Sequence, residues 1–312
     1  MKKLNFIVIS TLIIILSSCL DDSDLEKLRD EEIKTLKAYL QAKGIEYKGT
    51  DYIYIVYADS SKRDTSSIKA DKNYYALIDY NIRLLSDNKL VETNNHKLAK
   101  ENSLKPVSVL KGPVIISLKK PPLYGIYYTL LQMTETDSVV AVIPSDYAFG
   151  SNSTNLVPSN SSLLFEVRLV KIIKDPAEYD KSFWNRWVVD TLGLSLEDTT
   201  EEVPVYMKVI DEGNKSLPVD DYTSVKVGYR GWLADGRAFS NDWDTITYSL
   251  GTSDIIKGFD IAVKKLNQGG YAKVFIPYYH AYGSSGKTNY YYQTVIPPYS
   301  SLYYEIIIIN GN

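Results

Sequence analysis

Strand-like segments, some with alternating apolar and polar residues and some almost entirely apolar, recur along the chain from residue 52 to its end. Such segments predict strands, because alternate side chains of a strand share one face. They are residues 52–57, 74–85, 114–118, 139–143, 203–210, 225–229, 246–250, 272–276 and 302–309. Residues 125–133 and 256–266 instead predict one short helix within each group of strands, and Gly269-Gly270 follows the second. The polar stretch 92–107 is predicted to be a loop.

A longer helix is predicted near the N-terminus. Ser23 followed by Glu26 is typical of a helix start, leucines recur at helical spacing up to Leu40, and Gly44 stands where the helix would stop. This helix either packs on the neighbouring domain or serves as a spacer or dimerisation helix.

A further helix is predicted in the middle of the chain. Asp175 is a helix cap, Pro176 suits the first helical position, and Gly193 is expected to end the helix. Its large apolar residues are expected to pack in a core or between domains, with a ligand site as the alternative: Phe183, Trp184, Trp187 and Val188. The polar stretch 195–202 is the predicted linker.

Two matched motifs occur twice in the same order. Residues 143–150 and 276–283 share I-P-x-x-x-A-aromatic-G, and residues 157–167 and 296–306 share V/I-P-x-x-S-S-L-x-aromatic-E-V/I. Such self-similarity indicates an internal duplication. Asp87-Asn88 and Asp235-Gly236 predict turns, the latter within a hairpin. The predicted fold class is therefore α+β, with two tandem antiparallel domains at 51–174 and 203–312, joined by the helix and linker 175–202.

The first residues are typical of an export signal. Lys2 and Lys3 precede an apolar run from Phe6 to Leu16, which is too short to span a bilayer comfortably. The run ends in Leu-Ser-Ser before Cys19, which resembles the bacterial lipobox. This predicts a signal peptide at 1–18, lipidation of Cys19, and a tether with helix at 19–50. An ordinary signal peptide with an incidental cysteine is the alternative.

The lipobox resemblance implies an outer-membrane lipoprotein of the cell envelope, held to the membrane by an N-terminal lipid anchor. The acidic stretch 20–24 resembles the surface-export signal of some Gram-negative lipoproteins. The protein is therefore expected on either the periplasmic or the surface-exposed face.

Composition excludes several kinds of chemistry. With one cysteine, the chain can form neither an internal disulfide framework nor a thiolate metal site. The two histidines, His96 and His280, are far apart in sequence, so no metal is expected. No glycine-rich phosphate motif occurs, and no cofactor is expected. A net charge of −3 without a basic cluster argues against a nucleic-acid partner.

The second unit resembles a known family. Residues 227–239, VGYRGWLADGRAF, resemble the V-x-Y-x-G-x-L-x-D-G-x-x-F motif of FKBP-type peptidyl-prolyl isomerases. Residues 250–260, 281–283 and 296–305 resemble the remaining family motifs, in family order. The resemblance implies a twisted antiparallel sheet wrapped around a short helix, with an apolar pocket between them. By position, the pocket is lined by Tyr229, Phe239, Ile255, Ile256, Phe259, Tyr282, Ile296 and Tyr304.

The resemblance also implies a reaction without nucleophile, metal or cofactor. Rotation about an X-Pro amide bond is accelerated by stabilising the twisted amide in an apolar pocket. The implied donors are the backbone N–H of Ile256 and the hydroxyl of Tyr282, and Phe239 and Tyr229 complete the catalytic set. Two residues depart from the family pattern. Ser240, in the substrate-binding set, stands where an aspartate is usual, and Phe259 replaces the usual tryptophan.

The first unit matches the family less well. Tyr80 and Phe165 fit the pocket, but Phe149 lacks the phenol hydroxyl, Val91 replaces the front aromatic residue, and 123–126 gives an aliphatic floor. We expect a degenerate, non-catalytic copy that stabilises the protein or binds client proteins. In the second unit, the loop 284–294 carries Tyr290, Tyr291 and Tyr292 and either grips clients or covers the site.

The predicted function is isomerisation of proline-containing segments of client proteins, assisting the folding of exported or envelope proteins. The alternative from another class is a non-catalytic FKBP-like lipoprotein that binds clients or serves as a scaffold. A structural, adhesin-like lipoprotein is a third hypothesis, suggested by the tyrosine content alone.

Overall fold

The computed structural model describes residues 22–48, 53–57, 67–104, 112–119, 123–152, 154, 156–198, 204–219, 224–240, 242–253, 255–288 and 294–311. The predicted signal peptide, Cys19 and Tyr290–Tyr292 lie outside these residues. In the part of the chain that is described, no helix is long and apolar enough to cross a membrane.

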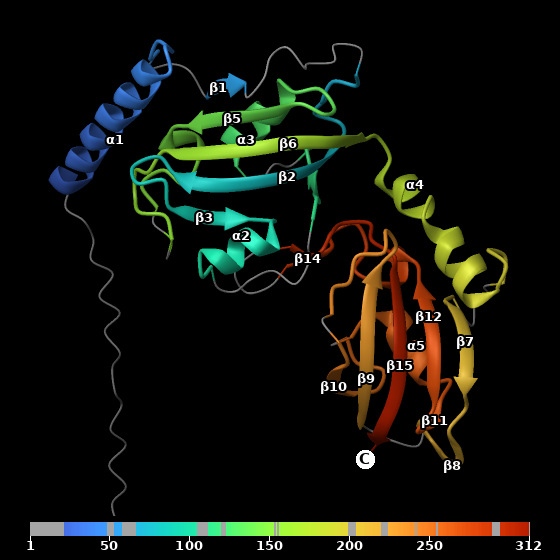
Figure 1. Cartoon of the computed structure of the whole chain (residues 1–312). Coiled ribbons are helices and arrows are strands. Elements are labelled where there is room, and N and C mark those ends of the chain that lie inside the picture. The colour runs from blue at the N-terminus through green and yellow to red at the C-terminus, as the bar shows by residue number, and fades with distance from the viewer. Residues whose placement is uncertain are drawn as a thin grey trace, which may run out of the picture.

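The first domain is built on one antiparallel sheet with the strand order β1-β5-β6-β2-β3, and β4 also pairs with β2 (Figure 1). Its strands are β1 Tyr54–Tyr57, β2 Tyr75–Leu84, β3 Leu90–Thr93, β4 Val114–Ser117, β5 Ser138–Ile143 and β6 Leu163–Ile173. Its core helix is α3, Tyr124–Leu131.

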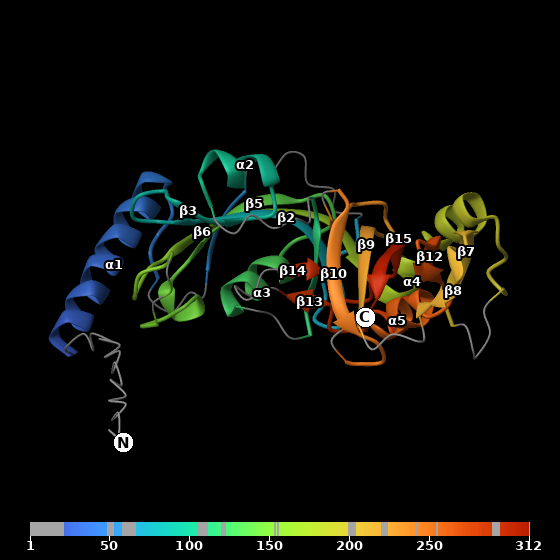
Figure 2. The same ribbon diagram turned by 90° about the horizontal axis from the view of Figure 1, so that it is seen from below.

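The second domain repeats this order as β7-β12-β15-β9-β10. Its strands are β7 Tyr206–Asp211, β9 Ser224–Leu233, β10 Asp244–Ser249, β12 Tyr271–Ile276 and β15 Leu302–Gly311, and its core helix is α5, Lys257–Val263. In Figure 2, α3 and α5 each lie below the sheet of their own domain. The predicted α+β class with two tandem domains is confirmed.

The repeated turns have the same backbone geometry in both domains. Gly150 and Gly283 have positive φ angles of 61° and 63°, which glycine adopts at little cost. The Asn160 N–H donates to the Gly150 carbonyl at 2.8 Å, and the Tyr299 N–H donates to the Gly283 carbonyl at 2.9 Å. The duplicated sequence motifs therefore fold into the same turns.

A glycine lets each core helix approach its sheet. A Cβ atom on Gly125 would lie 2.2 Å from Cγ2 of Ile143, and one on Gly258 would lie 2.3 Å from Cγ2 of Ile276. Real side chains do not approach so closely, so only glycine allows the observed separation. In the second domain this close approach brings the start of α5 against the inner face of the sheet.

Each domain is preceded by a helix that covers part of the outer face of its sheet. Helix α1, Asp22–Ala42, buries Leu36 and Leu40 in a cluster with Tyr54, Val142 and Leu164. Its buried Glu32 accepts hydrogen bonds from the Ser145 N–H and from the hydroxyls of Ser145 and Ser162. These contacts correspond to the first alternative for this helix, packing on its neighbouring domain.

The middle helix packs in the equivalent way on the second domain. Trp184 and Trp187 are buried together with Phe275 and Tyr303. The buried Asp180 accepts hydrogen bonds from the Ser301 N–H and hydroxyl and from the Trp184 indole N–H. Ser162 and Ser301 occupy the same place in the repeated motif. The structural repeat therefore consists of a helix with a buried carboxylate followed by a sheet domain.

This middle helix is less regular than predicted. Asp175 caps α4, Pro176–Lys181, by accepting from two backbone N–H groups, as expected. The chain then turns and continues as a π-helix over Arg186–Leu192, which ends at Gly193 with φ 70°. The apolar pattern predicted which residues are buried, but not the irregular turn. In the π-helix that follows the turn, Trp187 stacks on Tyr303 with ring centroids 4.2 Å apart.

The prediction of a loop over 92–107 is wrong for most of its described residues. Strand β3 extends to Thr93, and α2, His96–Glu101, follows with Asn95 as its cap. Within α2 only Ala99 is buried, so the helix has no apolar stripe that the sequence could show. Two small strand pairs were also missed: β8 Asn214–Pro218 with β11 Asn267–Gln268, and β13 Lys287–Thr288 with β14 Thr294–Ile296.

Candidate functional site

The residues predicted to line the site of the second domain lie in one hydrophobic cluster between the sheet and α5. Four of them are buried: Ile256, Phe259, Ile296 and Tyr304. The others are half-buried against this core: Tyr229, Phe239, Ile255 and Tyr282. The fold thus brings together site residues that are far apart in the sequence: Tyr229 on β9 lies beside Tyr304 on β15, with ring centroids 5.9 Å apart.

Tyr304 stands at the centre of the aromatic cluster. Its ring centroid lies 5.1 Å from that of Phe259, 5.4 Å from Phe239 and 5.9 Å from Tyr229, all edge to face. This arrangement places the positive edge of one ring against the negative face of another. Burial raises the pKa of Tyr304 well above its ordinary value, and burial together with Asp244 raises the pKa of Tyr229. Both phenols are therefore neutral at physiological pH.

Ile256 supplies a backbone donor at the start of α5. It is the N-cap residue, with φ −63° and ψ 140°, so its N–H precedes the helix. None of the hydrogen bonds found among the described residues uses this N–H. A backbone donor at this position, beside an apolar cluster, is suited to a ligand carbonyl.

Tyr282 supplies a side-chain hydroxyl at the edge of the same cluster. Its oxygen accepts a hydrogen bond of 3.3 Å from Nζ of Lys287, which also lies 5.2 Å from the centroid of the tyrosine ring. The phenol O–H remains a donor while its oxygen accepts from the ammonium group. The sequence did not indicate Lys287, because its contact depends on how the following loop folds back.

Ser240 and Gly231 hold the aromatic wall in place. The buried Ser240 hydroxyl accepts a hydrogen bond of 2.7 Å from the Gly231 N–H. A Cβ atom on Gly231 would lie 2.2 Å from Cζ of Phe239, so the absent side chain makes room for the ring. The serine that departs from the family pattern therefore has a positioning contact. In the sequence, only the glycine of the V-x-Y-x-G motif, Gly231, indicated the space next to the Phe239 ring.

The comparison with known families agrees with this geometry. Residues 66–170 and 216–309 match the model of the FKBP-type peptidyl-prolyl cis-trans isomerase family. The chain belongs to this family. The match covers both domains, including the first, in which the motifs are less complete.

Several named FKBP-type proteins are similar to parts of the chain. The FKBP-type isomerase FkpA of Escherichia coli is 27% identical over 191 residues, 56% of this chain and 64% of the relative. An FK506-binding protein of Neisseria meningitidis is 34% identical over 88 residues, 27% of this chain and 76% of the relative. Human FKBP10 is 27% identical over 173 residues, 54% of this chain, and the chain spans only 25% of its length.

Among solved structures, the three FKBP domains of wheat FKBP73 align with 85% of this chain and 96% of the wheat chain. The sequence identity is 17% and the TM-score is 0.32. A peptidyl-prolyl cis-trans isomerase of Pseudomonas syringae aligns with 44% of this chain and 94% of its own, with 22% identity and a TM-score of 0.34.

The first FKBP-type domain has a half-buried acid, Glu92, that the sequence did not indicate. The Tyr80 hydroxyl donates a hydrogen bond of 2.5 Å to the Glu92 carboxylate. Burial raises the pKa of both groups, and the hydrogen bond partly offsets the rise for Glu92. Glu92 follows Val91 as Ser240 follows Phe239. The carboxylate that is absent from the second domain is thus present in the first. The sequence did not indicate the role of Glu92, because it lies in the polar stretch 92–107, which predicts a loop.

The first domain has a larger residue at the position of Gly231, next to Phe239. Ile82 lies opposite Phe165 in the sheet, as Gly231 lies opposite Tyr304. Ile82 is buried in the core, at the strand position where Gly231 leaves room for the Phe239 ring in the second domain. Val91, which is smaller than phenylalanine, packs in the same core.

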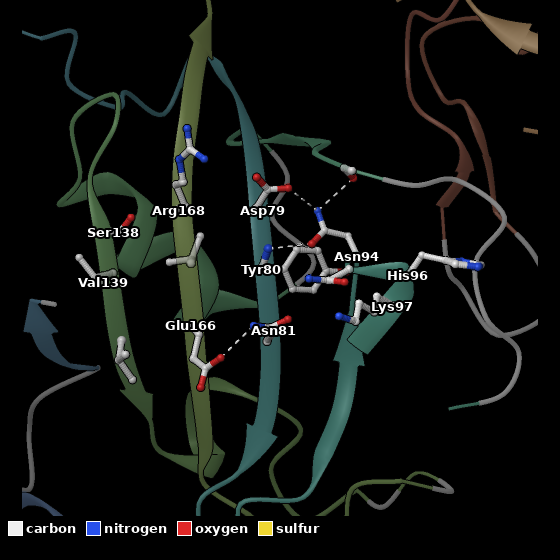
Figure 3. Close-up of a pocket in the computed structure, with 14 residues that line it drawn as sticks. Asp79, Tyr80, Asn81, Asn94, His96, Lys97, Ser138, Val139, Glu166 and Arg168 are labelled. Carbon is white, nitrogen blue, oxygen red and sulfur yellow. Dashed lines mark hydrogen bonds between the residues drawn. The ribbon is translucent and has the colours of Figure 1, made fainter. Parts of the chain in front are cut away.

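A separate polar hollow of about 660 Å³ lies on the outer face of the first sheet, beside α2 (Figure 3). Figure 3 shows Asp79, Asn81, Glu166 and Arg168 standing on neighbouring strands, and Asn81 donates to Glu166 at 2.8 Å. Asn94 closes one side by donating to the carbonyls of Ile78 and Gly112. The sequence did not indicate this hollow, because polar residues on one face of a strand predict a solvated surface.

No metal site emerges in the described part of the chain, where no group of three or more potential ligands comes together.

Proposed function

We propose that the second domain, 203–312, is a peptidyl-prolyl cis-trans isomerase that acts on proline-containing segments of client proteins. The observation that carries the proposal is the N–H of Ile256, which no hydrogen bond among the described residues uses, beside the aromatic cluster of a domain that matches the family. In this proposal Tyr282, Ile256, Phe239 and Tyr229 act on the amide, and the remaining site residues bind the substrate: Ile255, Phe259, Ile296, Tyr304 and Ser240.

The mechanism follows from the resonance of the amide bond. Rotation about an X-Pro bond meets a barrier of about 20 kcal/mol, because twisting removes the partial double bond. The apolar cluster holds the proline ring and excludes water, and the Ile256 N–H and the Tyr282 hydroxyl donate to the carbonyl oxygen of the twisted amide. Only stabilisation that is stronger for the twisted than for the planar amide lowers the barrier, and about 1.4 kcal/mol of it gives a tenfold rate increase.

The test is a proline isomerisation assay on a short X-Pro peptide, with the chain that follows Cys19. The wild type is compared with Tyr282→Phe, which removes only the hydroxyl, and with Phe239→Ala, which removes the wall. We expect both variants to lose most of the activity while they stay folded. A folded wild type without activity above buffer would instead favour the non-catalytic client-binding function, which the structural use of Ser240 supports.

The first domain, 51–174, is proposed to be a non-catalytic copy. The larger residue Ile82 at the position of Gly231 and the absence of a phenol at Phe149 support this assignment. A chain that carries Tyr282→Phe and Phe239→Ala together should therefore show no remaining turnover. Residual activity that depends on Tyr80 would contradict the assignment.

We further propose that the protein is an outer-membrane lipoprotein of the cell envelope that assists the folding of exported proteins. The leader that ends at Cys19 supports this location. Cys19→Ala should release the protein from the membrane fraction, with Ser18→Ala as the control that keeps the lipidated residue. Continued membrane association of Cys19→Ala would refute the lipid anchor.

A further inference from the structure

Two contacts from the first domain reach the second domain next to residues of its site. At one, the Arg237 guanidinium donates to the carbonyl oxygen of Pro113. Arg237 lies two positions before Phe239, in the turn that carries the front wall. At the other, the hydroxyls of Tyr75 and Tyr299 are 3.4 Å apart and hydrogen-bonded, with their rings edge to face at 5.8 Å.

The acceptor for Arg237 is held rigidly within the first domain. Pro113 directly precedes β4, which pairs with β2, and its neighbour Gly112 accepts a hydrogen bond of 3.1 Å from Asn94. Asn94 is buried and also bonds to the backbone of β2. Arg237 itself is oriented by Asp235, which accepts from its Nε at 2.8 Å. The contact thus joins the sheet of one domain to a turn of the other.

The second contact reaches the opposite side of the site. The Tyr299 N–H donates to the carbonyl of Gly283, the residue after Tyr282. Tyr299 has a φ of 56°, which is uncommon for a residue with a side chain, so surrounding contacts must hold it. Tyr75, which packs with Leu77 and Ile173 of the first domain, provides such a contact.

We propose that the first domain positions the two loops that form the isomerase site of the second domain. Arg237 and Tyr75 are positioning residues in this arrangement: the former holds the turn that carries Phe239, and the latter holds the loop that ends at Tyr282. The proposal rests on the proposed function of the second domain. It assigns the non-catalytic copy a direct effect on the turnover of its neighbour.

The two contacts should affect different kinetic constants. Phe239 grips the proline ring in both the planar and the twisted amide, so loosening it weakens ground-state and transition-state binding equally and raises KM. Tyr282 donates preferentially to the twisted amide, so misplacing it lowers kcat. We expect Arg237→Ala to raise KM about three- to tenfold with little change in kcat, because the turn loses its hydrogen bond to Pro113 of the first domain. Tyr75→Ala should lower kcat by a similar factor with little change in KM.

The controls separate positioning from general loss of stability. Arg83→Ala removes a cation of the first domain that pairs with Glu166, away from both contacts, and should leave kcat and KM unchanged. Arg237→Lys keeps a cationic donor, so its KM should lie between those of the wild type and Arg237→Ala. Circular dichroism should confirm that each full-length variant is folded. Wild-type kinetics in both Arg237→Ala and Tyr75→Ala, or equal changes in Arg83→Ala, would overturn the proposal.

A measurement independent of turnover keeps this proposal distinct from the proposed function. The chain contains 7 phenylalanines, so fluorine NMR of fluorophenylalanine-labelled protein can resolve Phe239, assigned by its loss in Phe239→Ala. Arg237→Ala should shift or broaden this signal, whereas Arg83→Ala should not. If the wild type proves inactive but the Phe239 signal responds to Arg237→Ala, the proposed function fails and the positioning contact stands. An unchanged signal refutes the contact.

Discussion

Replacing Gly231 with alanine tests how the wall that Phe239 forms at the proposed isomerase site is built. The added Cβ would lie 2.2 Å from Cζ and 2.3 Å from Cε2 of Phe239, far inside the 3.5–4.0 Å of normal carbon contacts. The ring cannot stay where it is, because Tyr304 stands against it at 5.4 Å between centroids. The methyl group must therefore displace Phe239 from the wall.

Overpacking of this kind costs about 1–3 kcal/mol of folding free energy. Because the displaced ring also stops lining the site, kcat/KM for a proline peptide should fall by about tenfold or more. Denaturant unfolding measures the first quantity, and the isomerisation assay measures the second. Gly228→Ala is the matched control on the same strand: its Cβ would meet Ile307 at 2.9 Å, and that side chain is partly exposed and can rotate away.

The first domain suggests a compensating change. There, Ile82 occupies the position of Gly231 and the smaller Val91 occupies that of Phe239. The double variant Gly231→Ala, Phe239→Val should therefore recover most of the lost stability but none of the lost activity. If Gly231→Ala keeps wild-type stability and turnover, or if the double variant is no more stable than Gly231→Ala alone, the packing argument is wrong.

Three further predictions concern carboxylates that are buried or half-buried. Burial raises the pKa of Asp180 to about 6, so the folded protein binds this proton more tightly than the unfolded chain, whose aspartate pKa is about 4. The stability that the protonated Asp180 contributes is therefore complete below about pH 4 and is lost as the pH rises towards 6. Wild-type stability relative to Asp180→Asn should therefore fall between pH 4 and pH 6, by up to about 3 kcal/mol in urea unfolding. Glu32→Ala leaves the Ser145 N–H unpaired and should cost about 2–3 kcal/mol in the same assay, whereas exposed Glu31→Ala should be near neutral. Glu92→Gln should remove the carboxylate of the first domain without changing turnover, and a fall in kcat would contradict its non-catalytic assignment.

The family motifs in the sequence indicated which residues of the second domain gather in one cluster, and local rules account for part of that set. Tyr229 and Tyr304 face the core because alternate residues of a strand share one face, and Ile256 precedes a helix that glycine allows close to the sheet. These are local rules that hold within one motif. The duplication was visible for the same reason, since each copy keeps its turn residues at the same spacing, as the matching φ angles of Gly150 and Gly283 show.

The tertiary structure alone decided which polar partners those residues have. Glu92 contacts Tyr80 because β3 pairs with β2 in one particular register. A four-residue strand in a polar segment gives no sequence pattern from which this pairing could be predicted. The bond from the Gly231 N–H to Ser240 likewise depends on how the hairpin folds back. The contact between Arg237 and Pro113 joins residues that are 124 positions apart in two domains. Sequence periodicity records which face of an element is apolar, whereas partners across elements are set by register and docking.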